Sequence, residues 1–272
     1  MSKLLRSFLF VPASRPERIN KALASGADAV IVDLEDAVEE AAKPQARLNL
    51  LQYFSQNPSA QVYLRINSIQ DTDNYQADLE LCGYPQVIGV FLPKAEHVEP
   101  INALFKLINK PLILIIETAL GVHQVTDLAQ ANGVQQLSFG ALDLALDLGF
   151  RMGTPGAQQL CDQVRYALLV ASCLGGIAAP IDAVYPRISD EQGLCKQARD
   201  AADMGFSGVL AIHPKQIKDI HQAFAPSVEE IEWAQQVLAL YAEHEKGVFM
   251  LNGEMIDAPV IAKARGIAIH AI

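Results

Sequence analysis

Short runs of apolar residues recur along the chain, separated by turn residues and by stretches with helical spacing. Several runs are apolar at consecutive positions, as in Leu112–Ile116, which is typical of parallel strands covered on both faces. Read as strands, the runs are Ser7–Val11, Ala29–Asp33, Val62–Ile66, Gly89–Leu92, Leu112–Ile116, Gln136–Phe139, Ile181–Val184 and Gly208–Ile212. Helix-like stretches in the intervals are Glu17–Ser25, Lys43–Gln56, Val98–Ile108, Gly121–Ala131, Ala157–Leu174 and Glu191–Met204.

Eight strand and helix units in 272 residues predict an α/β protein with a closed (β/α)8 TIM barrel. A doubly wound open sheet usually has fewer strands and a glycine-rich first turn, which this sequence lacks. The tail exceeds what a barrel needs: a helical stretch at Val228–Glu245, a glycine-bounded segment from Gly247 to Gly253, and a helix-like run from Ala258. We therefore expect a barrel catalytic domain over residues 1–225 and a C-terminal helical extension or lid over residues 226–272.

Composition narrows the class of function. Hydrophobic residues make up 51% of the chain, which is enough for a large core, and the net charge of −10 argues against nucleic acid or acidic membranes as partners. The chain contains no run of about 18 uncharged apolar residues, which is the length needed to span a membrane. The four cysteines lie far apart with no Cys-x-x-Cys pair, so we expect reduced thiols and a cytoplasmic protein.

Polar residues follow most of the predicted strands. In a barrel these strand ends surround the common active-site mouth. One such residue alone is more often an ordinary surface charge, but seven strands ending this way predict a site. The strand-end residues are Asp33, Glu35, Asp36, Arg65, Asn67, Lys94, Glu117, Thr118, Gly140, Asp143, Asp182 and His213.

Glu117 and Asp143 are the strongest candidate ligands for a metal ion. Two carboxylates from adjacent strands, completed by water and substrate oxygens, suit the octahedral coordination of Mg²⁺. Arg65 would then offer a rigid guanidinium fork to a substrate carboxylate; the less favoured alternative, an ion pair with Glu35 or Asp33, is compatible with that role.

Other chemistries have weaker support. Lys94 is the only lysine at a strand end, so a Schiff-base aldolase stays open, but an ion pair with the acidic residues is the simpler interpretation. For His213, a contact with substrate and a structural hydrogen bond are equally supported interpretations. The N-terminal region is locally basic, which suits a nucleotide-type phosphate or an ordinary solvated helix face; its cations are Lys3, Arg6, Arg15, Arg18 and Lys21.

Eight strings in order along the chain carry a family resemblance: Arg6-Ser-Phe-Leu-Phe-Val-Pro12, Asp33-Leu-Glu-Asp-Ala-Val38, Leu64-Arg-Ile-Asn67, Leu92-Pro-Lys94, Ile116-Glu-Thr118, Phe139-Gly-Ala-Leu-Asp143, Ala211-Ile-His-Pro214 and Met255-Ile-Asp-Ala-Pro259. The chain resembles the citrate lyase β-subunit-like family of CoA-ester lyases, within the HpcH/HpaI aldolase superfamily. The resemblance covers nearly the whole chain. It is more specific for the family than for the substrate.

The resemblance implies a (β/α)8 barrel, usually a homotrimer, with a role for each matched residue. Glu117 and Asp143 match the Mg²⁺ ligands, and Arg65 matches the arginine that binds and acts on the substrate carboxylate. Glu35 matches the acidic motif near the metal and is expected to be catalytic, and Gly140 is expected at the substrate.

Residues outside these strand ends are assigned by the same resemblance. Asp257 matches a lid aspartate that performs acid/base chemistry in a neighbouring subunit's site. Arg15, Arg18 and Lys21 lie where relatives approach CoA. Members often have a lysine after the strand-eight glycine, whereas Val209 follows Gly208 here. The missing cation leaves open the CoA contacts, and with them the choice between free CoA and an acyl-carrier protein.

The implied activity is a Mg²⁺-dependent, reversible Claisen-type cleavage of a CoA thioester of the malyl-, citramalyl- or citryl-CoA class. Its products would be acetyl-CoA or a homologue and a 2-oxo acid. Two alternatives remain: a CoA-independent aldolase acting on hydroxy-oxo acids, and a non-catalytic subunit of a lyase complex.

Overall fold

The computed structural model describes residues 5–243 and 248–270, and contacts divide the chain into two compact units, Met1–Ala223 and Phe224–Ile272. Each unit is described by itself. No described helix is long and apolar enough to cross a membrane.

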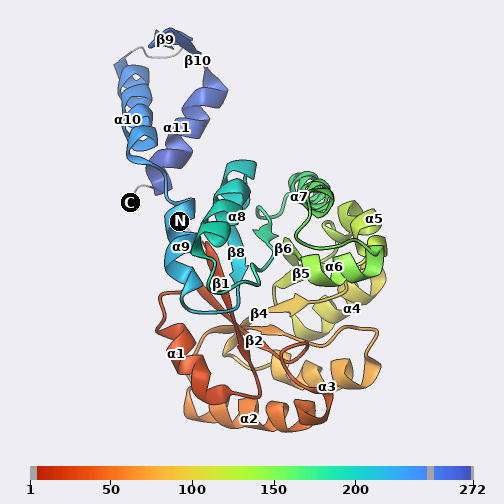
Figure 1. Cartoon of the computed structure of the whole chain (residues 1–272). Coiled ribbons are helices and arrows are strands. Elements are labelled where there is room, and N and C mark those ends of the chain that lie inside the picture. The colour runs from red at the N-terminus through yellow and green to blue at the C-terminus, as the bar shows by residue number, and fades with distance from the viewer. Residues whose placement is uncertain (1–4, 244–247, 271–272) are drawn as a thin grey trace. The chain divides into compact units, whose positions relative to one another are not determined.

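The first unit is a closed barrel of eight parallel strands, and the predicted TIM-barrel fold is confirmed (Figure 1). Neighbours in sequence are neighbours in the barrel, and Ser7 pairs with Val209 where the last strand meets the first. The strands are β1 (Ser7–Pro12), β2 (Ala29–Asp33), β3 (Val62–Arg65), β4 (Val87–Leu92), β5 (Leu112–Ile116), β6 (Val134–Phe139), β7 (Ile181–Asp182) and β8 (Gly208–Ala211).

Helices follow the strands around the outside of the barrel, as Figure 1 shows. They are η1 (Pro16–Arg18), α1 (Ile19–Leu23), η2 (Glu40–Ala42), α2 (Lys43–Gln56), α3 (Thr72–Cys82), α4 (Val98–Ile108), α5 (Ala119–Leu128), α6 (Ala141–Leu148), α7 (Pro155–Gly175), α8 (Glu191–Met204) and α9 (Gln216–Phe224). Among these, α3, α6 and α9 were not predicted. The reason is clearest for α3, whose buried face includes Asn74 and Asp78 and so lacks an apolar stripe.

The barrel interior is filled by aliphatic and aromatic side chains from most of its strands. Phe8, Phe91 and Ile31 are fully buried there, and the Phe8 and Phe91 rings meet edge to face with centroids 6.0 Å apart. Apolar side chains therefore fill the middle of the barrel.

The amino ends of the strands are closed by structural contacts. The backbone of β8 approaches that of β1 so closely that a Cβ at Gly208 would lie 2.6 Å from the carbonyl oxygen of Arg6. Ser7 Oγ lies 2.8 Å from Nε2 of His221, which in turn lies 3.1 Å from Asp28 Oδ2. These contacts join β1 to α9. The candidate active site is therefore expected at the carboxyl ends of the strands.

The second unit contains α10 (Val228–Glu243), the antiparallel strands β9 (Phe249–Leu251) and β10 (Glu254–Ile256), and α11 (Ala258–His270). Its small core includes Val237, Phe249 and Ile256. Gly247 lies outside the described residues, and Gly253 sits with Asn252 in the hairpin turn, both at positive φ. Most of the glycine-bounded segment noted in the sequence therefore belongs to a β-hairpin.

Candidate active site

A cavity of about 330 Å³ opens at the carboxyl ends of the barrel strands. It brings together strand-end residues that are distant in sequence, as expected for a barrel mouth. Its polar lining consists of Asp33, Asp36, Arg65, Glu117, Gly140 and Asp143. Five of these are charged, so the sequence-predicted metal ligands and the carboxylate-binding arginine share one small space.

Arg65, at the end of β3, is held by carboxylates on several sides. Its Nε and Nη2 bind Oδ1 and Oδ2 of Asp33 at 2.8 and 2.5 Å, and its Nη1 lies 3.1 Å from Glu35 Oε2 and 3.4 Å from Asp36 Oδ2. Burial alone would lower the pKa of the guanidinium, but Asp33 and Glu35 raise it by more, so Arg65 stays charged. The ion-pair interpretation of Arg65 is therefore correct, and its side chain also lines the cavity.

Glu117 ends β5 and is only 2% exposed. Its Oε1 accepts a hydrogen bond of 3.0 Å from the backbone N–H of Lys94, and its Oε2 occupies the space that a Cβ at Gly140 would fill. Burial raises the pKa of Glu117 to about 8, and the nearby carboxylate of Glu35 adds to the rise. Glu117 is thus a carboxylate whose charge is costly unless a cation approaches it.

Gly140 has a structural reason to be glycine. Any side chain there would collide with Glu117, and its own N–H donates to the carbonyl of Ile116 at 3.1 Å. Substrate contact at Gly140 stays a prediction.

Lys94 follows β4 and points its ammonium at the same carboxylates. Nζ lies 2.8 Å from Glu35 Oε1 and 3.9 Å from Glu117 Oε1. Burial would lower the pKa of Lys94, but the bond to Glu35 outweighs this and raises it. A Schiff-base lysine needs a depressed pKa to act as a free amine, so the geometry disfavours the aldolase alternative at this residue.

The acidic groups outnumber the cations at this end of the barrel. Around Arg65 and Lys94 lie five carboxylates: Asp33, Glu35, Asp36, Glu117 and Asp143. Glu35 Oε2 is buried and has no hydrogen bond, because its contact with Arg65 lacks the required alignment. The excess of carboxylates over cations and the buried Glu35 oxygen without a hydrogen bond both indicate that a further cation binds here.

The residues fit a divalent, oxygen-seeking metal ion. Among the described residues no group of three or more His, Cys, Asp or Glu side chains is arranged around one metal position. Mg²⁺ does not require such a group, since it commonly binds one or two carboxylates and keeps water or substrate oxygens elsewhere. Glu117 and Asp143 supply that donor set.

Three other strand-end residues have structural roles. Asn67 accepts a bond from Lys43 Nζ at 2.6 Å, and Asp182 pairs with the buried Arg165 at 2.8 Å. His213 Nδ1 accepts a bond from the backbone N–H of Lys215 at 3.2 Å. Sequence reasoning missed Arg165, which would have explained Asp182.

The predicted CoA-binding residues Arg15, Arg18 and Lys21 lie exposed along η1 and α1. Arg15 Nε pairs with Glu17 at 2.7 Å. Arg6 directly precedes β1 and pairs with Asp28 at 3.3 Å, while Lys3 lies outside the described residues. Because Arg15, Arg18 and Lys21 follow β1, Arg6 lies at the other end of this strand and does not belong with them.

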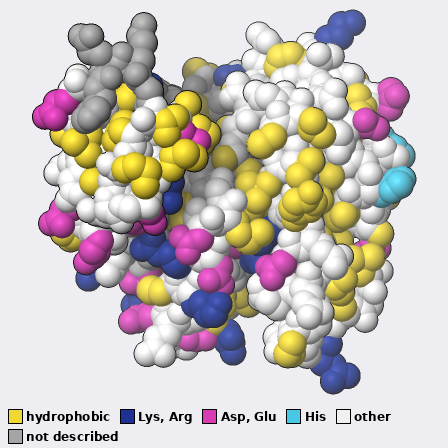
Figure 2. Space-filling model, turned by 90° about the horizontal axis from the view of Figure 1, so that it is seen from above, with side chains coloured by type: hydrophobic (Ala, Val, Ile, Leu, Met, Phe, Trp, Pro, Cys, Tyr) yellow, Lys and Arg dark blue, Asp and Glu magenta, His cyan; other side chains and the backbone are white. Residues whose placement is uncertain are grey.

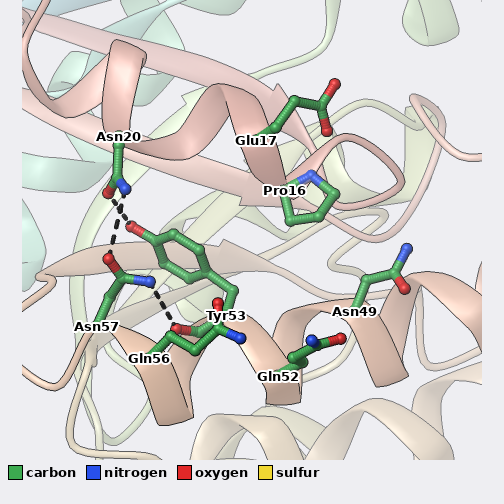
Figure 3. A pocket seen from close by; sticks show the side chains of 8 residues that line it. All are labelled: Pro16, Glu17, Asn20, Asn49, Gln52, Tyr53, Gln56 and Asn57. Carbon is green, nitrogen blue, oxygen red and sulfur yellow. Dashed lines mark hydrogen bonds between the residues drawn. The ribbon is translucent and has the colours of Figure 1, made fainter.

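Beside these cations lies a pocket of about 320 Å³ between α1 and α2 (Figure 3). Uncharged amides dominate its lining, and Tyr53 donates to Asn20 Oδ1 at 2.6 Å. Its lining residues are Pro16, Glu17, Asn20, Asn49, Gln52, Tyr53, Gln56 and Asn57. The sequence analysis did not find this pocket, since its members come from two helices.

Asp257 belongs to the second unit and immediately precedes α11. Its Oδ1 accepts a long bond of 3.4 Å from the N–H of Val260, and its carbonyl accepts from Ile261 at 3.0 Å. This is the arrangement of a helix N-cap, where aspartate is common for structural reasons. Its catalytic role stays a prediction.

The closed barrel and the charged cavity at the carboxyl ends of its strands define a (β/α)8-barrel enzyme. The model of the HpcH/HpaI aldolase/citrate lyase family matches residues 6–214. A citrate lyase subunit beta-like protein of Mycobacterium tuberculosis is 39% identical over 94% of this chain and 92% of that protein. The mitochondrial citramalyl-CoA lyase of Rattus norvegicus is 32% identical over 96% of this chain and 84% of that protein.

A crystal structure of protein CitE from M. tuberculosis in complex with magnesium, acetoacetate and coenzyme A is also similar. It superposes with a TM-score of 0.87 at 36% identity, covering 98% of this chain and 97% of the other. The chain belongs to the HpcH/HpaI aldolase/citrate lyase family, and it is a carbon–carbon lyase.

Proposed function

We propose that the protein is a Mg²⁺-dependent lyase of the malyl-, citramalyl- or citryl-CoA class. It cleaves a CoA thioester whose hydroxyl-bearing carbon also carries a carboxylate, giving acetyl-CoA or a homologue and a 2-oxo acid, or it runs the reverse condensation. The observation that carries the proposal is the surplus of carboxylates around Glu117 in the cavity that Arg65 also lines. The complex of the similar M. tuberculosis protein with magnesium and coenzyme A supports it.

Glu117 and Asp143 would hold the metal ion, which supplies a Lewis acid for the carboxylate and hydroxyl oxygens of the substrate. Arg65 binds the substrate carboxylate with a fork that Asp33 keeps in one orientation. Glu35, which contacts both Lys94 and Arg65, is also a proposed catalytic residue. When a base accepts the hydroxyl proton, the carbon–carbon bond breaks and its electron pair leaves with the acyl portion, giving a 2-oxo acid and a thioester enolate.

The enolate needs a proton, and Asp257 is the proposed donor. In the condensation direction the same carboxylate removes that proton. Arg15, Arg18 and Lys21 are the proposed contacts of the CoA phosphates; Val209 is fully buried in β8 and offers no cation there.

The experiment is a panel of malyl-, citramalyl- and citryl-CoA with Mg²⁺, in which release of 2-oxo acid is measured. We expect one or more thioesters to be cleaved, EDTA to abolish the activity, and added Mg²⁺ to restore it. Cleavage of CoA-free hydroxy-oxo acids instead would favour the aldolase alternative. Inactivity on every substrate, together with no binding of CoA, would favour the non-catalytic subunit.

We also propose a homotrimer in which Asp257 serves a neighbouring subunit's site. Figure 2 shows hydrophobic side chains gathered on the barrel unit, and α6, α7 and the loop between them expose many large ones. These are Leu142, Leu146, Leu148, Met152, Leu160, Tyr166, Val170 and Leu174. Large apolar side chains exposed in such number on neighbouring segments are typical of contact between subunits.

Complementation tests the shared site. Asp257→Asn and Glu117→Gln proteins should each be nearly inactive alone. Unfolded and refolded together, they should regain part of the activity, because mixed oligomers contain some sites with both residues intact. A monomer in solution, or a mixture no more active than its parents, would show that Asp257 does not act in another subunit.

A further inference from the structure

A second and larger pocket, of about 600 Å³, adjoins the catalytic cavity. It is formed by α6, the start of α7 and the segment after β7. Ala141, Leu142 and Val184 line both spaces. Because Asp143 follows directly after Leu142, the pocket begins beside a proposed metal ligand.

The lining of this pocket is mainly apolar. Besides the shared residues it includes Met152, Pro155, Ala157 and Pro186. A volume of this size accepts a group much larger than a methyl group.

The charged group deepest in its wall is already neutralised. Arg165 binds Asp182 through Nε at 2.8 Å and Nη2 at 3.1 Å, and its Nη1 binds Asp162 at 2.8 Å. Gln197 donates to Asp182 at 3.0 Å and to the carbonyl of Ala183 at 2.9 Å.

The polar groups nearer the opening are engaged in the same way. Tyr185 donates to Asp190 and accepts a bond of 2.9 Å from Arg187, while Gln158 donates to Asp162 at 2.9 Å. Arg187 at the opening is 72% exposed and lies 3.4 Å from Asp190, so its charge is shared with that acid and faces water. A charged substituent entering the inner part of the pocket would lose water without gaining a free partner there, whereas an alkyl substituent would gain by burial.

The pocket is also well placed for the end of the substrate that is remote from CoA. The proposed CoA contacts lie on η1 and α1, after β1, while the pocket lies after β6 and β7; α1 and α7 are well separated around the barrel in Figure 1. A substrate held between Glu117 and Asp143 can thus extend its thioester one way and the substituent of its 2-oxo acid portion another.

We propose that this pocket selects 2-oxo acids with an alkyl side chain longer than the methyl group of pyruvate, in preference to the carboxymethyl group of oxaloacetate. The proposal rests on the proposed function and specifies its substrate class. Each methylene buried in the pocket should raise kcat/KM by about fourfold.

The test compares glyoxylate, pyruvate, oxaloacetate, 2-oxobutyrate and 4-methyl-2-oxopentanoate in condensation with acetyl-CoA and Mg²⁺, with products identified by mass spectrometry. Binding of each acid to the Mg²⁺-loaded protein is measured by calorimetry. The wild-type protein should use 4-methyl-2-oxopentanoate at least tenfold better than pyruvate or oxaloacetate.

Gln158→Trp fills the pocket from an exposed helix position, and Gln159→Trp is its matched control, equally exposed on α7 but outside the lining. The ratio of kcat/KM for 4-methyl-2-oxopentanoate to that for pyruvate should fall at least tenfold in Gln158→Trp. In Gln159→Trp the ratio should stay at the wild-type value.

A wild-type preference for the short acids or oxaloacetate overturns the proposal and leaves the lyase function intact. A preference for long acids that Gln158→Trp does not change overturns the assignment to this pocket. If no acid reacts, the proposed function fails; the affinities measured by calorimetry, with the same two variants, then decide whether the pocket binds alkyl 2-oxo acids.

Discussion

Arg65 and Arg165 are two buried arginines that each bind one aspartate through two nitrogens, yet their surroundings differ. Around Arg165, the Asp182 carboxylate is bonded on both oxygens, by Arg165 and by Gln197, and the remaining acid, Asp162, is 46% exposed to water. Around Arg65, the carboxylates continue inward to Glu117, whose pKa is raised to about 8.

This difference in the number of neighbouring carboxylates distinguishes a purely structural ion pair, at Arg165, from one that belongs to a candidate active site, at Arg65. Both arginines bind an aspartate that ends a strand, Asp33 of β2 or Asp182 of β7, so the strand-end position of the acid does not distinguish them. When every charged group of a network has a partner, the network does not attract a further ion. When buried carboxylates outnumber their cationic partners, the network tends to bind a cation or a proton. The measurements below test whether that surplus belongs to a metal site.

The largest effect is expected from Glu117→Gln. Loss of a charged ligand should weaken Mg²⁺ binding at least roughly 100-fold and reduce activity further, by analogy with the losses seen when even outer partners of metal ligands are removed. Titration calorimetry and kinetics measure both. Glu99→Gln, an exposed acid on α4, is the control and should change neither; unchanged Mg²⁺ affinity in Glu117→Gln would place the metal elsewhere.

Arg65→Lys and Arg165→Lys test the comparison directly. Each substitution keeps the charge but loses the fork, so each should destabilise the fold by about 1–3 kcal/mol in denaturant unfolding. Only Arg65→Lys should also weaken binding of pyruvate or glyoxylate to the Mg²⁺-loaded protein. Equal affinities in the two variants would make Arg65 purely structural.

Metal affinity should depend on pH. The pKa of Glu117 in the folded, metal-free protein is about 8, above its unfolded value, so between about pH 4.5 and 8 the native state holds a proton that the unfolded state lacks. Metal-free stability should therefore fall as pH rises through this window. Mg²⁺ must displace that proton, so its affinity should rise by up to about tenfold per pH unit and level off above pH 8. An affinity that is flat from pH 6 to 8 would contradict this account.

The smallest effect is expected from borohydride. Because the bond to Glu35 raises the pKa of Lys94, the amine stays protonated and should form no Schiff base. Mass spectrometry after treatment with borohydride and pyruvate should show the unmodified chain. A reduced adduct on Lys94 would instead support a Schiff-base aldolase.

The barrel was predictable because its strands are apolar at consecutive positions. Ala29–Asp33 and Leu112–Ile116 were predicted with the bounds that the structure gives. The helix α3 was missed because its partners are polar: Arg47 of α2 binds Asp78 at 2.7 Å, a pairing no periodicity records. The hairpin at Asn252–Gly253 carries a known turn signal that the sequence analysis overlooked.

The site was predictable as far as the strand-end rule reaches. That rule placed Arg65, Glu117 and Asp143 at one mouth, and the three line one cavity. It could not tell that Asp33 clamps Arg65, or that Asp182 serves a structural pair, because these depend on which side chains meet in three dimensions. A role that depends on a second subunit, such as the one proposed for Asp257, lies beyond both the rule and a single chain.

The backbone at Lys94 has a consequence for anyone who would engineer this protein. Lys94 has φ of 50°, and the other described non-glycine residues at positive φ are both asparagines, which tolerate that conformation. The strained turn directs the Lys94 N–H at Glu117 and its ammonium at Glu35. Glycine at position 94 would relieve roughly 1 kcal/mol of strain, but it would leave the buried carboxylates of Glu35 and Glu117 without their ammonium neighbour, which costs more. The usual stabilising exchange of a strained residue for glycine should therefore fail at this position unless another cation is supplied to the two acids.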